Sequence, residues 1–468
     1  MNALLVLLSL LVCGAVLFIA PSAAPPALML CVVVSIPIII MLARPSPERV
    51  FLLRLFVAGL LIRIVVGTII YSWNLQDFFG GDANTYDFFG YSLTKAWHGD
   101  TYHEAIYQTF IRSGAGAWGM LYLVGGVYEL IGRNMLAIQF INAAFGAVTP
   151  CIIYYSAQHL FGNLRVSRLA ALLTAFFPSL VLWSSQALKD GLIVLALALS
   201  IFATLQLVSK VSIRYVIVLT MCLLALLSLR FYIFYMMAVA VVGAFIIGVK
   251  SLSAQSFFSR FLAIAAMGLA LTWFGVLRYA SSQFERYGNL QAVQRSRVDA
   301  ATTAGSGFGK DVDVRTTEGA LTAVPIGLLY LLFAPFPWQL ASLRQSIAVP
   351  EMVVWWLCFP LLILGFWFAI KHRLREVSPI LLFTTMLTLA YSLFQGNVGT
   401  AYRQRSQLLV FYFIFVAVGA ILVKENAETR ERQRKLAKQE LAETQAARTL
   451  ARRKSTEPST SHPALRES

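Results

Sequence analysis

Charged residues are scarce in this 468-residue sequence. Only 13% of the residues are charged, against 58% that are hydrophobic, whereas a soluble domain carries roughly 25% charged residues. Long apolar runs recur along the chain, and about 20 apolar residues suffice to cross the hydrocarbon core of a membrane. Because backbone polar groups cannot bond to lipid, such runs have to be helical. The composition therefore excludes a soluble protein and predicts an all-α polytopic membrane protein.

Cysteine and histidine are also rare, with five of each. All five cysteines lie inside apolar runs without metal-ligand spacing, which predicts small buried side chains rather than a disulfide framework. We expect neither a cofactor nor a metal site. A divalent ion held between Asp82 and the region of His98 and His103 is the alternative.

About twelve transmembrane helices are expected. We place them at residues 3–20, 27–43, 50–72, 134–158, 165–183, 191–208, 213–229, 232–249, 260–279, 352–370, 378–395 and 404–423. The first run lacks the Lys/Arg-rich start of a cleaved signal peptide, so we expect it to be retained as a helix. Glycines or prolines interrupt two further apolar stretches, 115–132 and 321–340, which we expect to be interfacial or re-entrant.

The net charge of +16 lies mainly in short loops and in the C-terminal tail. This distribution is typical of membrane orientation and does not indicate nucleic-acid binding. With the main basic clusters on the cytoplasmic side, the transmembrane domain (1–423) has outer loops at 73–133 and 280–350. The tail, 424–468, is expected to be a cytoplasmic helix followed by a disordered end. A coiled-coil partner site on this tail is the alternative.

The first outer loop contains the sequence QDFFGGDANTYDFFGYSLTKAW. Gly80 and Gly81 permit a tight turn before Asp82, and residues 85–97 are typical of an amphipathic helix lying on the membrane interface. A carboxylate at this point can take a proton from an acceptor hydroxyl. The alternative is that Asp82 caps the helix. Tyr86 and Asp87 are candidate supporting residues.

Several basic residues lie near span ends on the same predicted side as Asp82, against the usual charge distribution. They are Lys189, Arg230, Arg403 and Arg405, with Asp190 and Tyr232 beside them as supporting residues. Guanidinium groups bind phosphate in bidentate fashion, so these residues are candidate phosphate ligands. An ordinary helix start at 189–190, a snorkelling arginine at 230 and charge flanking of the last span are the alternatives.

The order of these motifs resembles that of the GT-C glycosyltransferases. The similarity rests on the GGD loop with its interfacial helix, SSQALKD, the break at LSLR, APFPW and GTAYRQR, and it extends over roughly residues 50–423. This superfamily includes protein O-mannosyltransferases and the aminoarabinose transferases that act on lipid A. The chain departs from many members at Ala83, where they have a second acid, and at Gln139, where they have an arginine.

The resemblance implies a glycosyltransferase of the bacterial inner membrane, with its active site on the outer face. Asp82 would be the catalytic base, and Lys189, Arg230, Arg403 and Arg405 would bind the phosphate of a polyprenyl-phosphate-linked sugar. The acceptor would be a glycan or glycolipid in cell-surface assembly. One alternative is a polysaccharide polymerase or ligase that uses undecaprenyl-diphosphate-linked glycans. A second alternative is a transporter or flippase, although the chain has no clear internal repeat.

Overall fold

A computed structural model describes residues 3–112, 117–247, 254–276, 289–303, 306–309, 312–340 and 342–456. Within these ranges all regular elements are helices, which confirms the all-α class. They are α1 (Ala3–Ile19), α2 (Ala24–Leu42), α3 (Arg49–Ser72), α4 (Asp82–Trp97), α5 (Thr101–Arg112), α6 (Trp118–Ile131), α7 (Met135–Phe161), α8 (Leu164–Phe176), α9 (Pro178–Ser184), α10 (Lys189–Ser209), α11 (Ile213–Leu229), α12 (Phe231–Ile247), α13 (Ala254–Trp273), α15 (Leu290–Thr303), α16 (Thr317–Phe333), α17 (Leu343–Phe394) and α18 (Val398–Thr456).

Each of the twelve expected spans overlaps helical residues, although 165–183 covers both α8 and α9 and the last residues of 232–249 and 260–279 lie outside the described residues. Among the described residues, six helices are long and apolar enough to cross a membrane, or seven if the bent pair α8–α9 counts as one span. In this number of candidate spans, α17 is included once. A non-helical residue, Arg373, divides it into two helices that match the expected spans 352–370 and 378–395. Helices α1, α11 and α12 have 17 residues each, the lower end of the spanning range of about 17–25. The chain is therefore a multi-pass membrane protein.

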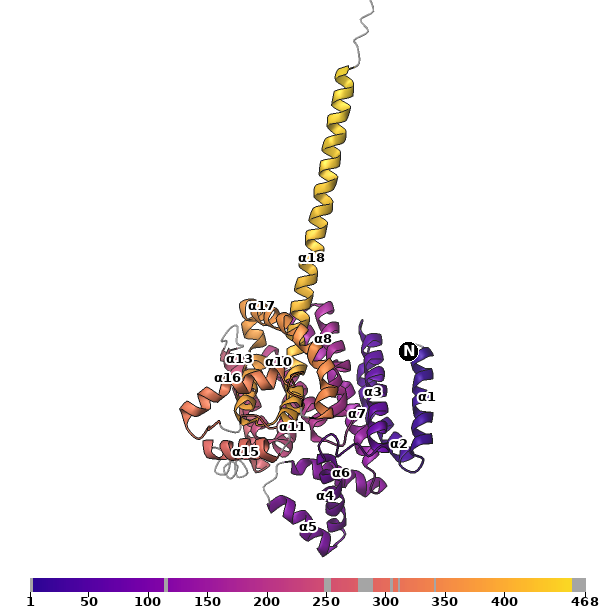
Figure 1. Cartoon of the computed structure of the whole chain (residues 1–468), viewed down its shortest axis with the longest axis vertical. Coiled ribbons are helices and arrows are strands. Elements are labelled where there is room, and N and C mark those ends of the chain that lie inside the picture. The colour runs from indigo at the N-terminus through magenta and orange to yellow at the C-terminus, as the bar shows by residue number, and fades with distance from the viewer. Residues whose placement is uncertain are drawn as a thin grey trace, which may run out of the picture.

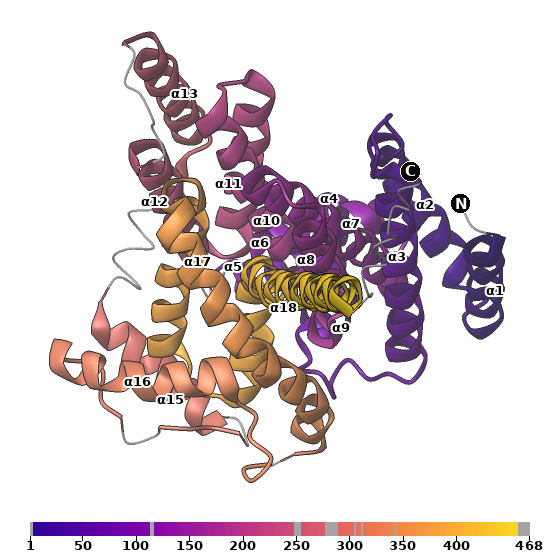
Figure 2. The ribbon, with the colours of Figure 1, turned by 90° about the horizontal axis from the view of Figure 1, so that it is seen from above.

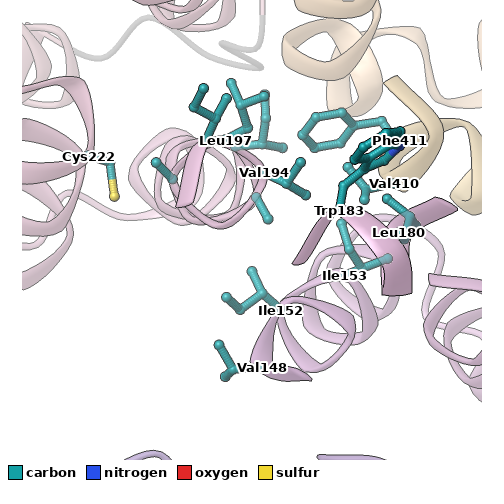
Figure 3. Close-up of a cluster of buried hydrophobic side chains, with 14 of the residues drawn as sticks. Val148, Ile152, Ile153, Leu180, Trp183, Val194, Leu197, Cys222, Val410 and Phe411 are labelled. Atoms are coloured by element: carbon teal, nitrogen blue, oxygen red, sulfur yellow. The ribbon is translucent and has the colours of Figure 1, made fainter. Parts of the chain in front are cut away.

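The bundle is arranged around α7, α10 and α18. Seen along α18, helices α1–α3 lie on one side of it, and α12, α13 and α15–α17 lie on the other (Figure 2). Side chains of α7, α9, α10, α11 and α18 meet in a buried apolar cluster that includes Ile153, Trp183, Val194 and Phe411 (Figure 3). Buried polar residues such as Asp190 and Ser184 lie next to this apolar cluster.

The short helices gather at one end of the molecule. Helices α4, α5, α6 and α15 lie opposite the end from which α18 projects (Figure 1). Helix α16 meets the turn between α17 and α18 at both of its ends, because Ala320 packs near Phe394 and Tyr330 packs near Val398. It therefore lies across this end of the bundle, while the membrane topology of 321–340 stays a prediction.

Beyond the bundle, α18 continues as a single projecting helix (Figure 1). Arg165 pairs with Glu428 at 3.1 Å, and Asn163 donates a hydrogen bond to Glu425 at 3.4 Å. These contacts join the first turns of the tail to the start of α8. The tail is helical as far as Thr456, and the expected disordered end, from residue 457 on, lies outside the described residues.

Helices α17 and α18 approach each other through two glycines. A Cβ at Gly365 would lie 1.9 Å from the carbonyl oxygen of Phe415, and one at Gly419 would lie 2.0 Å from that of Leu361. Only glycine fits at such distances, since a backbone carbonyl cannot swing aside as a flexible side chain can. This close packing joins the middle of α18 to the first half of α17.

We predict that Gly365→Ala destabilises the protein, because the added methyl group forces α17 and α18 apart. The expected loss is about 1–3 kcal/mol, the usual cost of overpacking. Thermal unfolding in one detergent, followed by tryptophan fluorescence, measures it. Gly14→Ala is the matched control, since a Cβ there would meet nothing within 4 Å. Equal unfolding temperatures for the two variants would contradict the packing described.

Candidate active site

Asp82 is the first residue of α4 and follows a left-handed turn. Gly80 has φ +130° and Gly81 has φ +72°, values that favour glycine. The residue that caps the helix is Gly81, and no side chain makes a capping bond there. The Asp82 carboxylate is thus not used as a helix cap. It is 46% exposed and points toward α18.

Arg403 bridges two carboxylates from distant parts of the sequence. Its Nη1 donates to Asp82 at 2.6 Å, and its Nε donates to Asp190 at 2.7 Å. The guanidinium also lies over the indole ring of Trp183, with 5.6 Å from Cζ to the ring centroid. The Asp190 side chain is fully buried. Arg403 therefore joins the starts of α4, α10 and α18 at one point.

Arg230 reaches the same carboxylate from the break between α11 and α12. Its Nη2 lies 3.5 Å from Asp190, and its Nη1 donates to the Tyr391 hydroxyl at 3.3 Å. Tyr391 in turn donates to Gln407 at 2.6 Å, and Tyr232 stands edge-on to the Tyr391 ring. Arg230 is therefore turned into the bundle and does not snorkel to an interface.

Lys189 lies beside this network at the first position of α10. Its Nζ is 5.9 Å from the centroid of the Tyr86 ring. Tyr86 is buried on α4, and burial together with the Asp82 carboxylate raises the pKa of its hydroxyl well above the ordinary value. Tyr86 is therefore neutral at physiological pH. Arg230 and Arg403 face Asp82 and Asp190, so two guanidinium groups balance two carboxylates, and Lys189 lies beside them as a further basic group.

A cavity of about 510 Å³ opens on one side of Asp82 and Arg403. It is lined by the 78–82 turn, Trp183, the start of α17 and the turn before α18. Arg344 lies on this wall, and the sequence analysis did not single it out. The Arg344 guanidinium contacts the Phe78 ring at 5.4 Å and donates one long bond, 3.4 Å, to the Asp77 carbonyl.

Four helices begin at this site. Helices α4, α17 and α18 begin in the wall of the cavity, and α10 begins at Lys189, next to the Arg403–Asp190 pair. A helix N-terminus carries a partial positive charge and free N–H groups, and it favours bound anions. The helix dipoles therefore add a positive potential to that of the basic side chains.

The structure does not bring Arg405 or Asp87 into this cluster. Arg405 is buried on another face of α18, where it donates to the carbonyls of Leu331 and Ala334 and so holds the end of α16. Asp87 accepts bonds from Tyr128, at 2.5 Å, and from Arg133. It joins α4 to α6 and to the loop before α7.

Behind Asp190 a small internal cavity of about 20 Å³ leads to Arg63, which is large enough for one water molecule. Arg63 is buried in α3 and donates to Ser184 at 2.8 Å and to the carbonyls of Gly59 and Ala175. Gln139 is also fully buried, and neither of its amide atoms has a hydrogen-bond partner. Buried polar side chains, Arg63 and Gln139, therefore lie in the interior next to the site.

The two histidines of the first loop have other partners than Asp82. His98 lies 3.0 Å from Glu129, and His103 lies 2.7 Å from Asp100. Across the ranges that the structure describes, no three His, Cys, Asp or Glu side chains gather to form a group that could hold a metal ion.

One family model matches the middle of the chain. Residues 117–278 match a family model described as dolichyl-phosphate-mannose-protein mannosyltransferase. The resemblance to the GT-C glycosyltransferases is confirmed. The matched residues include Lys189, Asp190 and Arg230, while Asp82 and Arg403 lie outside the match. No curated protein matches the chain. The match supports a membrane glycosyltransferase.

We predict that Asp190→Ala strongly destabilises the protein, whereas Asp82→Ala does not. Loss of Asp190 leaves Arg230 and most of Arg403 buried without a counter-charge, a change that costs about 3–5 kcal/mol. Loss of the half-exposed Asp82 leaves Arg403 paired with Asp190 and is expected to cost about 1 kcal/mol or less.

Thermal unfolding of both variants in the same detergent checks this difference. Asp190→Asn, which keeps the shape of the side chain and removes its charge, is the second variant if Asp190→Ala cannot be purified. Equal stability of the Asp82 and Asp190 variants would contradict the proposed burial of the bridge.

Proposed function

We propose that this protein transfers a sugar from a polyprenyl-phosphate donor to an acceptor hydroxyl, with Asp82 as the base. The observation that carries the proposal is the Arg403 bridge, which joins a half-exposed carboxylate to a buried cationic cluster at the edge of a cavity. The family match adds support, since the name of that family describes a mannosyltransferase that uses a lipid-phosphate-linked sugar. We further propose that this end of the molecule faces outward from the bacterial inner membrane.

The charge at the site suits a phosphate leaving group. The basic side chains and the helix N-termini stabilise an anion that develops next to Arg403. Apolar side chains of Leu343, Ile347 and Val398 line the same cavity. A phosphate with an attached lipid chain therefore meets both cations and apolar surface there.

The proposed reaction is a single displacement at the anomeric carbon. The acceptor oxygen forms a bond to this carbon while the bond to the phosphate oxygen breaks, and the configuration inverts. The acceptor proton passes to the Asp82 carboxylate. The electron pair leaves with the polyprenyl phosphate, whose charge is neutralised by Arg403 with Arg230 and Lys189 nearby.

Asp82 and the donor phosphate compete for the same guanidinium. The Asp82 oxygen that accepts from Arg403 at 2.6 Å is occupied and is not free to accept the proton of an acceptor hydroxyl. Binding of the donor phosphate to Arg403 would release Asp82 and make it available to the acceptor. We therefore propose that the donor binds first and that its phosphate activates the base.

The test compares wild-type protein with Asp82→Asn, using purified protein and radiolabelled polyprenyl-phosphate mannose. We expect transfer to be lost in the variant. We also expect binding of polyprenyl phosphate to tighten about 3- to 10-fold, because the competing carboxylate charge is gone. Asp100→Asn, in the same loop but paired with His103, is the control and should change neither quantity. Intact transfer by a folded Asp82→Asn variant would refute the role of Asp82.

Arg344 supplies a separate prediction. It lines the cavity without a carboxylate partner among the described residues, so it can meet the donor phosphate without first breaking an ion pair. We expect Arg344→Gln to weaken binding of polyprenyl phosphate about 10-fold, and Arg344→Lys to restore part of it. Arg295→Gln, on the exposed side of α15, is the matched control. Equal binding by the Arg344→Gln and Arg295→Gln variants would exclude Arg344 from the phosphate site.

A polymerase or ligase that uses undecaprenyl-diphosphate-linked glycans is the second candidate. Two arginines in one cavity, Arg344 and Arg403, suit two phosphate groups as well as one. Parallel binding measurements with polyprenyl phosphate and polyprenyl diphosphate separate the candidates. A preference for the diphosphate, with no transfer from monophosphate donors, would favour this second function.

A further inference from the structure

A second hollow, of about 570 Å³, lies on the other side of the turn that carries Asp82. Four segments form it: the turn between α1 and α2, the turn after α3, the first turns of α4 and the loop between α6 and α7. The proposed function gives no role to this hollow. Its size is within the range of about 300–1,000 Å³ typical of small-molecule sites.

The walls of the hollow are unusually polar. Asn74, Asp77, Asn84 and Arg133 line it, together with the ring of Tyr71. Asn84 donates to Asp77 at 2.8 Å, which leaves the Asn84 carbonyl oxygen and the second Asp77 oxygen available. The Asn74 amide is exposed and has no hydrogen-bond partner in the described part of the chain. Donors and acceptors therefore alternate around one space.

Part of this wall is rigid. Arg133 and Tyr128 hold Asp87 from two sides, and the bond to Asp87 together with the charge of this carboxylate raises the pKa of Arg133. Asn134 donates to the Ala23 carbonyl at 2.9 Å and caps α7. Pro26 and Met135 add a small apolar floor. A ligand would thus meet polar groups that are already held in position.

This set of groups suits a carbohydrate. Sugar hydroxyls both donate and accept hydrogen bonds, and planar amide, carboxylate and guanidinium groups can each bond to two neighbouring hydroxyls. The C–H faces of a sugar can pack against Tyr71 and the apolar floor. A lipid would leave the polar wall without partners, which carries a large desolvation cost.

The segment 77–84 contributes to both spaces, since Asp77 and Asn84 line the hollow while Gly80 and Asp82 line the cavity. A Cβ at Gly80 would meet nothing within 4 Å, and one at Gly81 would meet only Asp77, at 3.4 Å. A ligand seated in the hollow can therefore extend across these glycines and bring a hydroxyl to the Asp82 carboxylate.

We propose that this hollow binds the acceptor and that the acceptor is a carbohydrate. The inference rests on the proposed function, because only a sugar transfer at Asp82 requires an acceptor hydroxyl to reach this carboxylate across Gly80 and Gly81. It assigns the donor lipid and the acceptor glycan to opposite sides of residues 77–84.

The experiment probes purified full-length protein in lipid nanodiscs against immobilised neutral oligosaccharides and, in parallel, against immobilised Ser/Thr-rich peptides. We expect binding to oligosaccharides. Asn84→Ala and Asp77→Asn should each weaken it at least 10-fold. Glu104→Gln is the matched control, since it removes one negative charge from an exposed position of α5 in the same loop, away from the hollow, and it should bind as the wild type does.

Polyprenyl-phosphate binding, measured on the same samples, distinguishes failure of the acceptor site from failure of the proposed function. If Asn84→Ala and Asp77→Asn leave oligosaccharide binding unchanged, the acceptor site is overturned. The same holds if the wild type binds donor but binds only the peptides, or binds neither array. Loss of donor binding in the wild type would instead overturn the proposed function. Unchanged donor binding by the Asn84→Ala and Asp77→Asn variants shows that they are folded.

Discussion

The contact between Arg403 and two carboxylates is the interaction on which the rest of the site depends. It ties the start of α18 to α10 through Asp190 and to α4 through Asp82. A buried charge in a membrane protein is stable only if it is partnered, so Asp190 requires both Arg403 and Arg230. The helices that carry these residues are thereby held at one depth, and the half-exposed Asp82 is the member of the set that can exchange its partner.

This constraint explains why the charged residues gather at one end of an otherwise apolar bundle. Each of α4, α10, α17 and α18 starts there, so the positive ends of four helix dipoles meet the guanidinium groups. An apolar cluster between α7, α9, α10 and α18 packs next to the charged residues (Figure 3). Two hollows flank the Asp82 turn. The same arrangement can hold an anion, a base and a polar ligand within reach of one another.

Much of this could be predicted from the sequence, because charged residues in an apolar chain are conspicuous. Lys189, Arg230 and Arg403 each interrupt or begin an apolar run on the predicted side of Asp82, and the structure brings them together. The same argument could not show that Arg405 has a different role from Arg403. Residues two apart on a helix differ in direction by about 200°, so Arg405 faces away from Arg403. Arg344 was missed because nothing in the sequence of the predicted outer loop, 280–350, distinguishes this arginine from the others there. Tyr391 was missed because a tyrosine inside an apolar helix is ordinary, and the lateral position of α16 depends on packing that no local pattern encodes.

The central claim is that Arg403 exchanges its contact with Asp82 for a contact with the donor phosphate. Its most direct test is an electron cryomicroscopy structure of the protein with bound polyprenyl phosphate. The account predicts that phosphate oxygens contact the Arg403 guanidinium, that Asp190 keeps its contact with Arg403, and that the Asp82 carboxylate has moved away from Arg403 and faces the cavity. A phosphate bound elsewhere, with the Asp82–Arg403 pair intact, would contradict it.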